Sequence, residues 1–400
     1  MSHLISINAR ARYACVPKVD VSVIFGSEQM RVTVVEGPPQ AVRTFDDLSD
    51  KLTTADVETI REIFHTPLTG SFNWDYDSAN AKIRRLYELG KVHNWNSTMD
   101  VDWDAPCDMS DFPMESSLGA LCGYPEYEAL SHEEKVRFAW KGHAQTMSQF
   151  LHGEQGAMLV ASQLVSCAPT ADAKLYAASQ TFDEARHVEV FNSYLRRRCK
   201  MVYPINGNLK VLIDKVLADE RWDLKFIGMQ LIIEGLALAA FGAQIRTTRD
   251  PLLKQILELV MRDEGRHVAF GVNYLEDWIR ALPEQEIEDR AEFAYQACVI
   301  MRDRLFGLDV IREYGFDEEA ARKHILDSTV IGLFRELLFE RIMPNLKRVG
   351  LLTERMRPKY EALGALKYED LAGDVLIDWA QLERPLPTKE FLDANRTAAG

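Results

Sequence analysis

The chain has 400 residues, of which 47% are hydrophobic and 27% are charged, as in globular proteins with a large core. The 61 acidic residues outnumber the 47 basic ones and give a net charge of −14, which excludes the basic surface that nucleic-acid binding requires. The six cysteines include no C-x-x-C pair, which argues against a disulfide scaffold, a zinc ribbon or a cysteine-ligated iron–sulfur cluster.

The longest apolar stretch, Phe226 to Phe241, is interrupted by Gln230 and Glu234. It is too short and too polar at its centre to span a bilayer, so we expect no membrane association. The first residues lack an apolar segment of signal-peptide length, and we expect a cytoplasmic protein.

The N-terminal part differs in composition from the rest of the chain. Two β-branched runs, 21–25 and 30–35, flank a four-residue loop and predict a β-hairpin. Capping and periodicity predict helices over 54–64 and 78–92. The stretch 94–117 is rich in Asp, Asn, Ser and Pro, and predicts an irregular arm.

From His132 onward the pattern is strongly helical. Thr170 is a candidate N-cap, and Asp250 followed by Pro251 is a second. No sustained heptad seam is present, so a helix bundle fits better than a coiled coil. The predicted long helices cover 132–166, 171–200, 221–247, 251–281, 285–307 and 318–346.

The predicted fold is therefore mainly α. We assign 1–105 to an N-terminal arm with the hairpin and two helices, 106–346 to the bundle, and 347–400 to a C-terminal tail packed on the bundle.

One motif occurs twice in the helical region. Thirty residues separate a first glutamate from a Glu-x-x-His, and the whole arrangement repeats 80 residues later. The two pentapeptides around it, D-E-A-R-H and D-E-G-R-H, are nearly identical. The repeated residues are Glu154, Glu184 and His187 in the first copy, and Glu234, Glu264 and His267 in the second.

The spacing of the motif has a physical interpretation. Residues i and i+3 share one face of a helix, so each Glu-x-x-His presents a carboxylate and an imidazole together. Thirty residues suffice for two antiparallel helices, and two such hairpins would face four carboxylates and two imidazoles into a bundle. Four buried carboxylates need cations or protons to offset the cost of burial, and two divalent metals would supply the charge. The alternative is that the motif residues form ion pairs on the surface, but this does not explain why Glu234 lies in the apolar run 231–238.

Residues 132–281 resemble the ferritin-like di-iron carboxylate superfamily, in particular its oxygenase and oxidase branch. The D-E-x-R-H segments are similar to those of multicomponent monooxygenase hydroxylases, ribonucleotide reductase small subunits and R2-like ligand-binding oxidases. The segment 86–95, followed by Asp100 and Asp102, is similar to the part of those oxidases that precedes the bundle. The resemblance implies a ferritin-like four-helix bundle with extra helices and an N-terminal arm.

Carried over to this chain, the resemblance implies metal ligands and their supporting residues. Glu154, Glu184 and His187 would bind one metal, the second copy of the motif would bind the other, and one or two glutamates would bridge. Asp183 and Asp263 would accept hydrogen bonds from the imidazole N–H groups. The remaining candidates for supporting residues are Arg186 and Arg266, with surface salt bridges as their alternative, and Trp95, with core packing as its alternative.

Several positions differ from the patterns of the individual branches. Phe191 stands where reductase small subunits carry a radical tyrosine, and Leu238 stands where many hydroxylases carry a threonine. Gly156 and Met229 cannot form the Val–Tyr crosslink of the ligand-binding oxidases. Aryl-amine N-oxygenases add a histidine four residues before the last glutamate, where this chain has Val260. The sequence matches none of these branches in full.

Further candidates come from position alone. His143 could relay protons, and His324 could be an extra ligand, although a packing role is the simpler interpretation of each. His152 neighbours Glu154 but points elsewhere. Residues one helical turn from a ligand predict a substrate pocket, with core packing as the alternative. They are Phe150, Met158, Phe191, Gln230 and Leu238.

These features predict a non-haem di-iron oxygenase or oxidase that activates dioxygen to oxidise a small, largely apolar or aromatic substrate. The cofactor would be two iron ions, or a Mn/Fe pair, because carboxylate and imidazole ligands suit these metals. No nucleotide-binding motif is present, so we expect no flavin or nicotinamide site, and an external reductase or ferredoxin as the possible electron donor. We expect a homodimer. The alternative is a metal-binding or iron-storage ferroxidase protein without an organic substrate.

Overall fold

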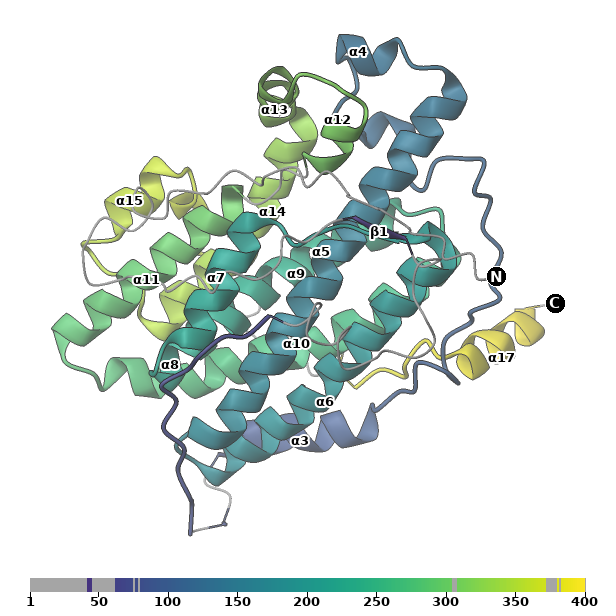
Figure 1. Ribbon diagram of the computed structural model, residues 1–400. Helices are drawn as coiled ribbons and strands as arrows, with labels where there is room; N and C mark the ends of the chain where they lie inside the picture. Colours follow the sequence, from purple (N-terminus) through teal and green to yellow (C-terminus); the bar gives the residue numbers. More distant parts are fainter. Residues whose placement is uncertain are drawn as a thin grey trace, which may run out of the picture.

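The structure, a computed structural model, is almost entirely helical in the part of the chain that it describes (Figure 1). A two-residue antiparallel pairing joins Arg43 to Val202 and Thr44 to Met201. The described residues are 42–44, 62–74, 76–77, 80–303, 308–371, 380 and 383–399.

The elements are, in chain order, β1 (Arg43–Thr44), α3 (Ala81–Val92), the 3₁₀ turn η2 (Ser116–Leu118), α4 (Pro125–Glu128), α5 (His132–Cys167), α6 (Ala171–Tyr194), the π-helical turn η3 (Leu195–Cys199), β2 (Met201–Val202), α7 (Gly207–Ala218), α8 (Trp222–Phe226), the π-helical segment η4 (Ile227–Ile233), α9 (Glu234–Thr247), α10 (Pro251–Arg280), α11 (Glu284–Asp303), α12 (Asp309–Glu313), α13 (Glu318–Leu326), α14 (Thr329–Val349), α15 (Arg357–Ala362), the 3₁₀ turn η5 (Leu366–Tyr368) and α17 (Lys389–Ala399).

The starts of the bundle helices are fixed by their capping residues. The Ser131 side chain accepts a hydrogen bond from the Glu134 backbone N–H, and the Glu134 carboxylate accepts one from the Ser131 N–H, which completes a capping box at α5. Thr170 caps α6 in the same manner, and Asp250 caps α10 with Pro251 in its first turn. The two starts predicted from the sequence are confirmed.

Four long helical stretches form the bundle around which the other elements pack. α5 lies against α6, and α10 lies against α9 and η4 (Figure 1). α3 covers α6 and α10, α14 covers α9 and α10, and α11 covers η4. Two apolar clusters fill the bundle: the first includes Val160, Tyr176 and Phe270, and the second includes Phe150 and Phe241. A third cluster of described residues lies outside it and joins α4, α12 and α13.

The third bundle helix is interrupted by a π-helical segment. Residues 227–233 are all buried, and η4 runs directly into Glu234, the first residue of α9. A π-turn adds one residue to the helical repeat and so rotates the residues after it by about 100° relative to a regular helix. The sequence predicted a continuous α-helix over 221–247, whereas in the structure a π-helical turn widens this helix immediately before Glu234.

Other differences concern helices that the sequence pattern did not resolve. The predicted helix over 318–346 is two helices, α13 and α14, because Ser328 caps a new helix by accepting from the Ile331 N–H. α7 was not predicted at all, and 171–200 ends in the π-turn η3. The predicted helix over 78–92 is present as α3, which begins after its N-cap Asn80.

Parts of the N-terminal prediction lie outside the described residues. The hairpin over 21–35 is one of them, and so is 54–61 of the first predicted helix; residues 62–64 have no regular secondary structure. The division at 105 and 346 stays a prediction, and α14 continues to Val349.

One helical stretch of the described chain, Trp222–Thr247, is long and apolar enough to cross a membrane, with a mean hydropathy of 1.7. Within the fold, 83% of that window is buried, which is the burial of a bundle core helix.

Gly271 allows α10 to approach η4 closely. A Cβ at this position would lie 2.5 Å from the Gln230 Cβ, which cannot move without its backbone. Gly271→Ala should therefore lower the free energy of unfolding by about 1–3 kcal/mol, as overpacking does. Urea denaturation of the metal-free protein measures the change.

Gly332→Ala is the matched control, because an added Cβ there meets nothing within 4 Å. It should raise stability by about 0.4–1 kcal/mol. Equal stabilisation by both substitutions would contradict the close approach at Gly271.

Candidate metal centre

The six motif residues converge at the centre of the bundle. Glu154 comes from α5, Glu184 and His187 from α6, Glu234 from the start of α9, and Glu264 and His267 from α10. Each of the six side chains belongs to a buried residue that is at most 5% exposed. Four helices thus contribute to one site, as the duplicated spacing predicted.

The six side chains form two overlapping groups of donors. One group consists of Glu154, Glu184, His187 and Glu264, and the other replaces Glu154 and His187 by Glu234 and His267. Within each group the donor atoms all lie within 4.8 Å of one another. Glu184 and Glu264 belong to both groups and occupy the position of bridging carboxylates.

Each imidazole directs its Nδ1 toward the carboxylates. Nδ1 of His187 lies 3.2 Å from Oε2 of Glu184 and 3.1 Å from Oε1 of Glu264. Nδ1 of His267 lies 3.1 Å from the other oxygen of Glu184 and 3.5 Å from the other oxygen of Glu264. Each bridging carboxylate therefore has one oxygen beside each imidazole.

The opposite ring nitrogens contact the two aspartates crosswise. Nε2 of His187, on α6, lies 3.1 Å from Oδ2 of Asp263, on α10. Nε2 of His267, on α10, lies 3.1 Å from Oδ2 of Asp183, on α6. In the neutral imidazole that a metal requires, an Nε2–H that donates to an aspartate leaves Nδ1 unprotonated, with its lone pair facing the carboxylates.

Two buried arginines complete this layer of the site. Arg266 donates to Asp183 at 3.0 Å and to Asp263 at 2.6 Å. Arg186 donates to Asp183 and, at 3.2 Å, to Asp263. Both arginines are at most 5% exposed, so surface salt bridges do not describe them. Two guanidinium groups and two carboxylates form a charge-balanced layer behind the imidazoles.

Trp95 joins the layer from the segment that follows α3. Its indole N–H donates to Asp263 Oδ2 at 2.8 Å, and its backbone carbonyl accepts from Arg186 at 2.8 Å. The Arg186 guanidinium also lies over the indole ring, 4.7 Å from its centroid. Trp95 is therefore bound to the site by directed contacts.

The electrostatics separate the glutamates. Burial, together with the neighbouring charge of Glu264, raises the pKa of Glu154 and of Glu234 well above the ordinary value. Burial alone would also raise the pKa of Glu184 and of Asp263. Contacts with His267 and His187 hold the pKa of Glu184 well below its usual range, and Arg266 with His187 does the same for Asp263.

Sequence reasoning missed Gln180. Its amide donates to Glu184 Oε1 at 3.2 Å and to Glu234 Oε1 at 2.8 Å, and its oxygen accepts from Gln230 at 3.2 Å. All four side chains are buried. Gln180 precedes Glu184 by four residues, so the one-turn rule applied to every ligand would have selected it.

The five residues predicted for a pocket lie in different surroundings. Phe150 lines a cleft of about 20 Å³ that also reaches Glu154, Glu234 and Glu264. The Phe191 ring packs 5.8 Å from Phe150 and 6.0 Å from Phe241, and is fully buried. Gln230 is engaged with Gln180, Leu238 belongs to the first apolar cluster, and Met158 is half-buried on α5.

The other candidate histidines are held by structural contacts. His152 Nε2 contacts the Tyr203 carbonyl at 2.8 Å, and His324 Nε2 contacts the Cys122 carbonyl at 3.0 Å on α13, outside the six-residue cluster. His143 Nε2 lies 2.9 Å from the Tyr194 hydroxyl, which in turn donates to Asp250.

Burial lowers the pKa of His143 to about 4, so this histidine is neutral near pH 7. Because the folded pKa lies below the unfolded value, the unfolded state binds more protons between pH 6.5 and 4, and stability falls as the pH drops through this range. His143→Gln retains a donor for Tyr194 and should remove about 2 kcal/mol of the destabilisation that accumulates between pH 7 and pH 4.5.

Free energies of unfolding measured at pH 7 and pH 4.5 for wild type and variant test this expectation. His132→Gln, at an exposed histidine, is the control. A wild-type pH dependence that persists in His143→Gln would refute the assignment.

Comparison with known proteins gives one family and several structural likenesses. The profile of the family described as p-aminobenzoate N-oxygenase AurF matches residues 77–350, more than half of the chain. No curated protein matches the sequence.

Solved structures that are similar to this chain include R2-like ligand-binding oxidases. One with an aerobically reconstituted metal cofactor after photoconversion has 19% identity and a TM-score of 0.43, covering 68% of this chain and 93% of that one. A single-residue mutant with an anaerobically reconstituted Mn/Fe cofactor has 20% identity and a TM-score of 0.40, covering 65% and 93%.

Proposed function

The chain belongs to the p-aminobenzoate N-oxygenase AurF family of ferritin-like di-iron oxygenases, and from this we propose that its six clustered residues bind two iron ions and activate dioxygen to oxidise a small, largely apolar or aromatic molecule. The observation that carries the proposal is the pair of overlapping donor groups with two shared glutamates. A Mn/Fe pair is the alternative metal content.

The donors present fit two such metals. Nδ1 of His267, both oxygens of Glu264 and Oε2 of Glu234 are buried and make no hydrogen bond to the described residues. Metal ligation requires the carboxylates ionised and the imidazoles neutral, so the six ligands would then carry four negative charges, which two divalent cations would neutralise. Nδ1 of His267 lies 3.1 Å from Glu184 Oε1, and this carboxylate raises the pKa of the imidazole, so the space between the two atoms favours a positive charge. Glu154 and His187 would hold one metal, Glu234 and His267 the other, and Glu184 and Glu264 would bridge.

The protein's own groups would orient and insulate this centre. The reduced iron ions would supply the electrons that activate dioxygen. Asp183 and Asp263 would fix the ring orientation and tautomer of the two imidazoles, and Arg186 and Arg266 pair with both aspartates. The apolar residues on both sides of the carboxylates exclude bulk water.

Val260 distinguishes this chain from the aryl-amine N-oxygenases. Aryl-amine N-oxygenases are similar to this chain at the six ligands but add a histidine at this position. Val260 is fully buried in the second apolar cluster and cannot ligate a metal. The proposed centre therefore has six protein ligands, and we leave the oxidised position of the substrate open to nitrogen or carbon.

The proposed reaction also requires an electron donor outside this chain. Oxygenation of a substrate consumes electrons, so an external reductase or ferredoxin would deliver them. We further propose that the protein is cytoplasmic and forms a homodimer. Gel filtration of the purified chain tests the oligomeric state.

The first test is metal content. Protein loaded anaerobically with Fe(II) should contain about two metal ions per chain, and Glu184→Ala combined with His187→Ala should abolish binding because both metals lose ligands. Glu189→Ala, at an exposed residue of the same helix, is the matched control.

A stoichiometry near zero in the wild type would overturn the proposal. Many irons per particle in a cage-like assembly would instead support iron storage. An oxygenase is expected to consume oxygen in proportion to an added organic substrate.

Gln180 provides a second test. Gln180→Leu removes both hydrogen bonds to the carboxylates, and metal affinity should fall by roughly 10- to 100-fold while the stoichiometry at saturation stays at two. Competition with a chelator of known affinity measures the change. Gln285→Leu, the same substitution at an exposed position of α11, should leave affinity unchanged. Equal affinities in both variants would show that Gln180 does not position the ligands.

A further inference from the structure

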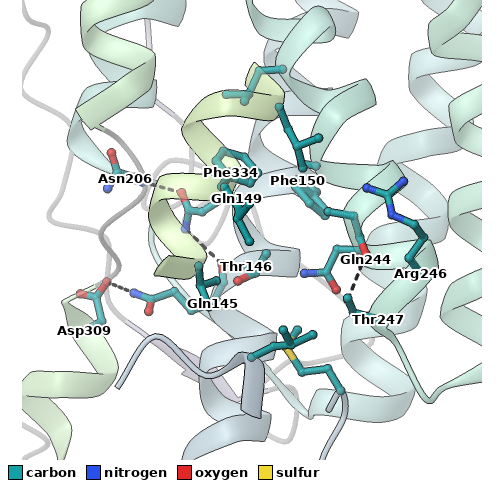
Figure 2. A pocket seen from close by; sticks show the side chains of 18 residues that line it. Gln145, Thr146, Gln149, Phe150, Asn206, Gln244, Arg246, Thr247, Asp309 and Phe334 are labelled. Carbon is teal, nitrogen blue, oxygen red and sulfur yellow. Dashed lines mark hydrogen bonds between the residues drawn. The ribbon is translucent and has the colours of Figure 1, made fainter. Parts of the chain in front are cut away.

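We propose that the substrate binds in a separate cavity between α5, α9 and α14, and that it is an uncharged apolar or aromatic molecule with a hydrogen-bonding group at the end that faces Gln244 (Figure 2). The inference rests on the proposed function, because it names the place and chemical class of the substrate of that centre.

The cavity has the size and lining of a small-molecule site. Its volume is about 370 Å³, within the range of ligand pockets. Leu236 and Ala240 line it from α9, and Phe334 and Leu337 line it from α14. Ala240 and Ala243 have short side chains, so they leave the space open at the α9 wall.

Phe150 connects this cavity to the candidate metal centre. Gln149 and Phe150 line both the cavity and the 20 Å³ cleft beside Glu154, Glu234 and Glu264. The cleft has room for about one water-sized molecule, which admits dioxygen but no organic substrate. A substrate must therefore occupy the larger cavity, with its reacting end against Phe150.

Most polar groups in the cavity wall are already engaged. Gln145 donates to Asp309 at 2.5 Å, and Gln149 accepts from the Asn206 N–H (Figure 2). Gln149 also donates to the Pro204 carbonyl. The Thr146 and Thr247 hydroxyls donate to backbone carbonyls of their own helices. These groups keep the wall polar in places but offer a ligand little hydrogen-bonding capacity.

Gln244 is different. Its carboxamide oxygen is buried and has no hydrogen-bond partner among the described residues. Figure 2 shows the Gln244 amide extending from α9 toward the middle of the cavity. An amide that is partly unsatisfied at a cavity wall favours a ligand hydroxyl, amine or amide over a purely apolar group.

The charges around the cavity favour an uncharged occupant. Asp309 is engaged by Gln145 and lies 3.4 Å from Arg312. Arg246 is an exposed residue of the wall, so its guanidinium is solvated. A buried charge on the ligand would lack a desolvated counter-charge, which makes its transfer from water costly.

The two ends of the cavity are set by positions on α5 and α9. The Phe150 ring lies 4.8 Å from the Phe241 ring, and Gln244 follows Phe241 by three residues, about one helical turn further from the carboxylates. A molecule with one aromatic ring spans this distance.

The experiment uses two probes that differ in one group, 4-methylbenzyl alcohol and 4-ethyltoluene. Their dissociation constants are measured by calorimetry on the Fe(II)-loaded protein without oxygen. Ala243→Phe should weaken both probes by at least 10-fold, because the added ring fills the cavity, while metal content stays at two per chain. Gln244→Leu should shift the ratio of the two dissociation constants by roughly 3- to 10-fold against the alcohol, since one hydrogen bond is lost.

Gln285→Leu is the matched control and should leave the ratio at its wild-type value. Failure of the wild type to bind either probe would overturn the inference, as would unchanged affinity in Ala243→Phe, or a ratio in Gln244→Leu equal to that in Gln285→Leu. Circular dichroism and metal content establish that each variant is folded.

The same samples separate the two proposals when oxygen and a reductant are added. Normal binding without oxidation of either probe would count against the proposed function while supporting the cavity. Oxidation at the wild-type rate in Ala243→Phe would support the function and overturn the cavity as the substrate site.

Discussion

Four carboxylates held within a few ångströms of one another, away from water, impose the constraint on which the rest of the structure depends. Glu184 and Glu264 are almost completely buried, and each lies between two imidazoles. Such a cluster is unfavourable unless cations enter it, and an isolated helix pair could not exclude water from it. The length of the bundle helices and the apolar clusters on both sides follow from the need to enclose this group of charges.

The layer behind the imidazoles solves a second electrostatic problem. Asp183 and Asp263 are themselves buried carboxylates, and Arg186 and Arg266 neutralise them within hydrogen-bonding distance. This layer carries no net charge, so it orients the rings without adding to the charge that the metals must balance. Trp95 ties the layer to the segment that directly follows α3, and α3 itself packs on α6 and α10.

Much of this could be predicted from the sequence because it is local or repeated. The i, i+3 pairs, the equal 30-residue spacings and the N-caps at Thr170 and Asp250 depend on short-range geometry, and the structure brings the six residues together as expected. The π-helical η4 could not be predicted, because a widened turn depends on the packing of neighbouring helices around Gly271 and not on periodicity. The break before Ser328 and the helix α7 were missed for a simpler reason: a polar cap inside a helical pattern and a short amphipathic helix are weak signals.

The surroundings of the site show the same limit. The rule that selects residues one turn from a ligand applies equally to Phe191, which packs among aromatic rings, and to Gln180, which binds two carboxylates. Whether such a position borders open space depends on the size of side chains further along the neighbouring helix, such as Ala240 and Ala243 on α9. The pocket residues named from the sequence therefore stay a prediction, of which Phe150 lies at the boundary of both cavities.

The crosswise contacts between the imidazoles and the aspartates carry an implication for the origin of the chain. His187 reaches Asp263 while His267 reaches Asp183, so residue i of one copy contacts residue j of the other, and j of the first contacts i of the second. This reciprocity is the mark of a twofold-symmetric interface between identical units. A single helical hairpin that carried one copy of the motif would build the same site at its dimer axis. The present chain has the arrangement expected after two such hairpins were fused by gene duplication. Once they were joined, the two halves could diverge: Gln180 in the first copy and Val260 in the second stand at equivalent positions, 80 residues apart.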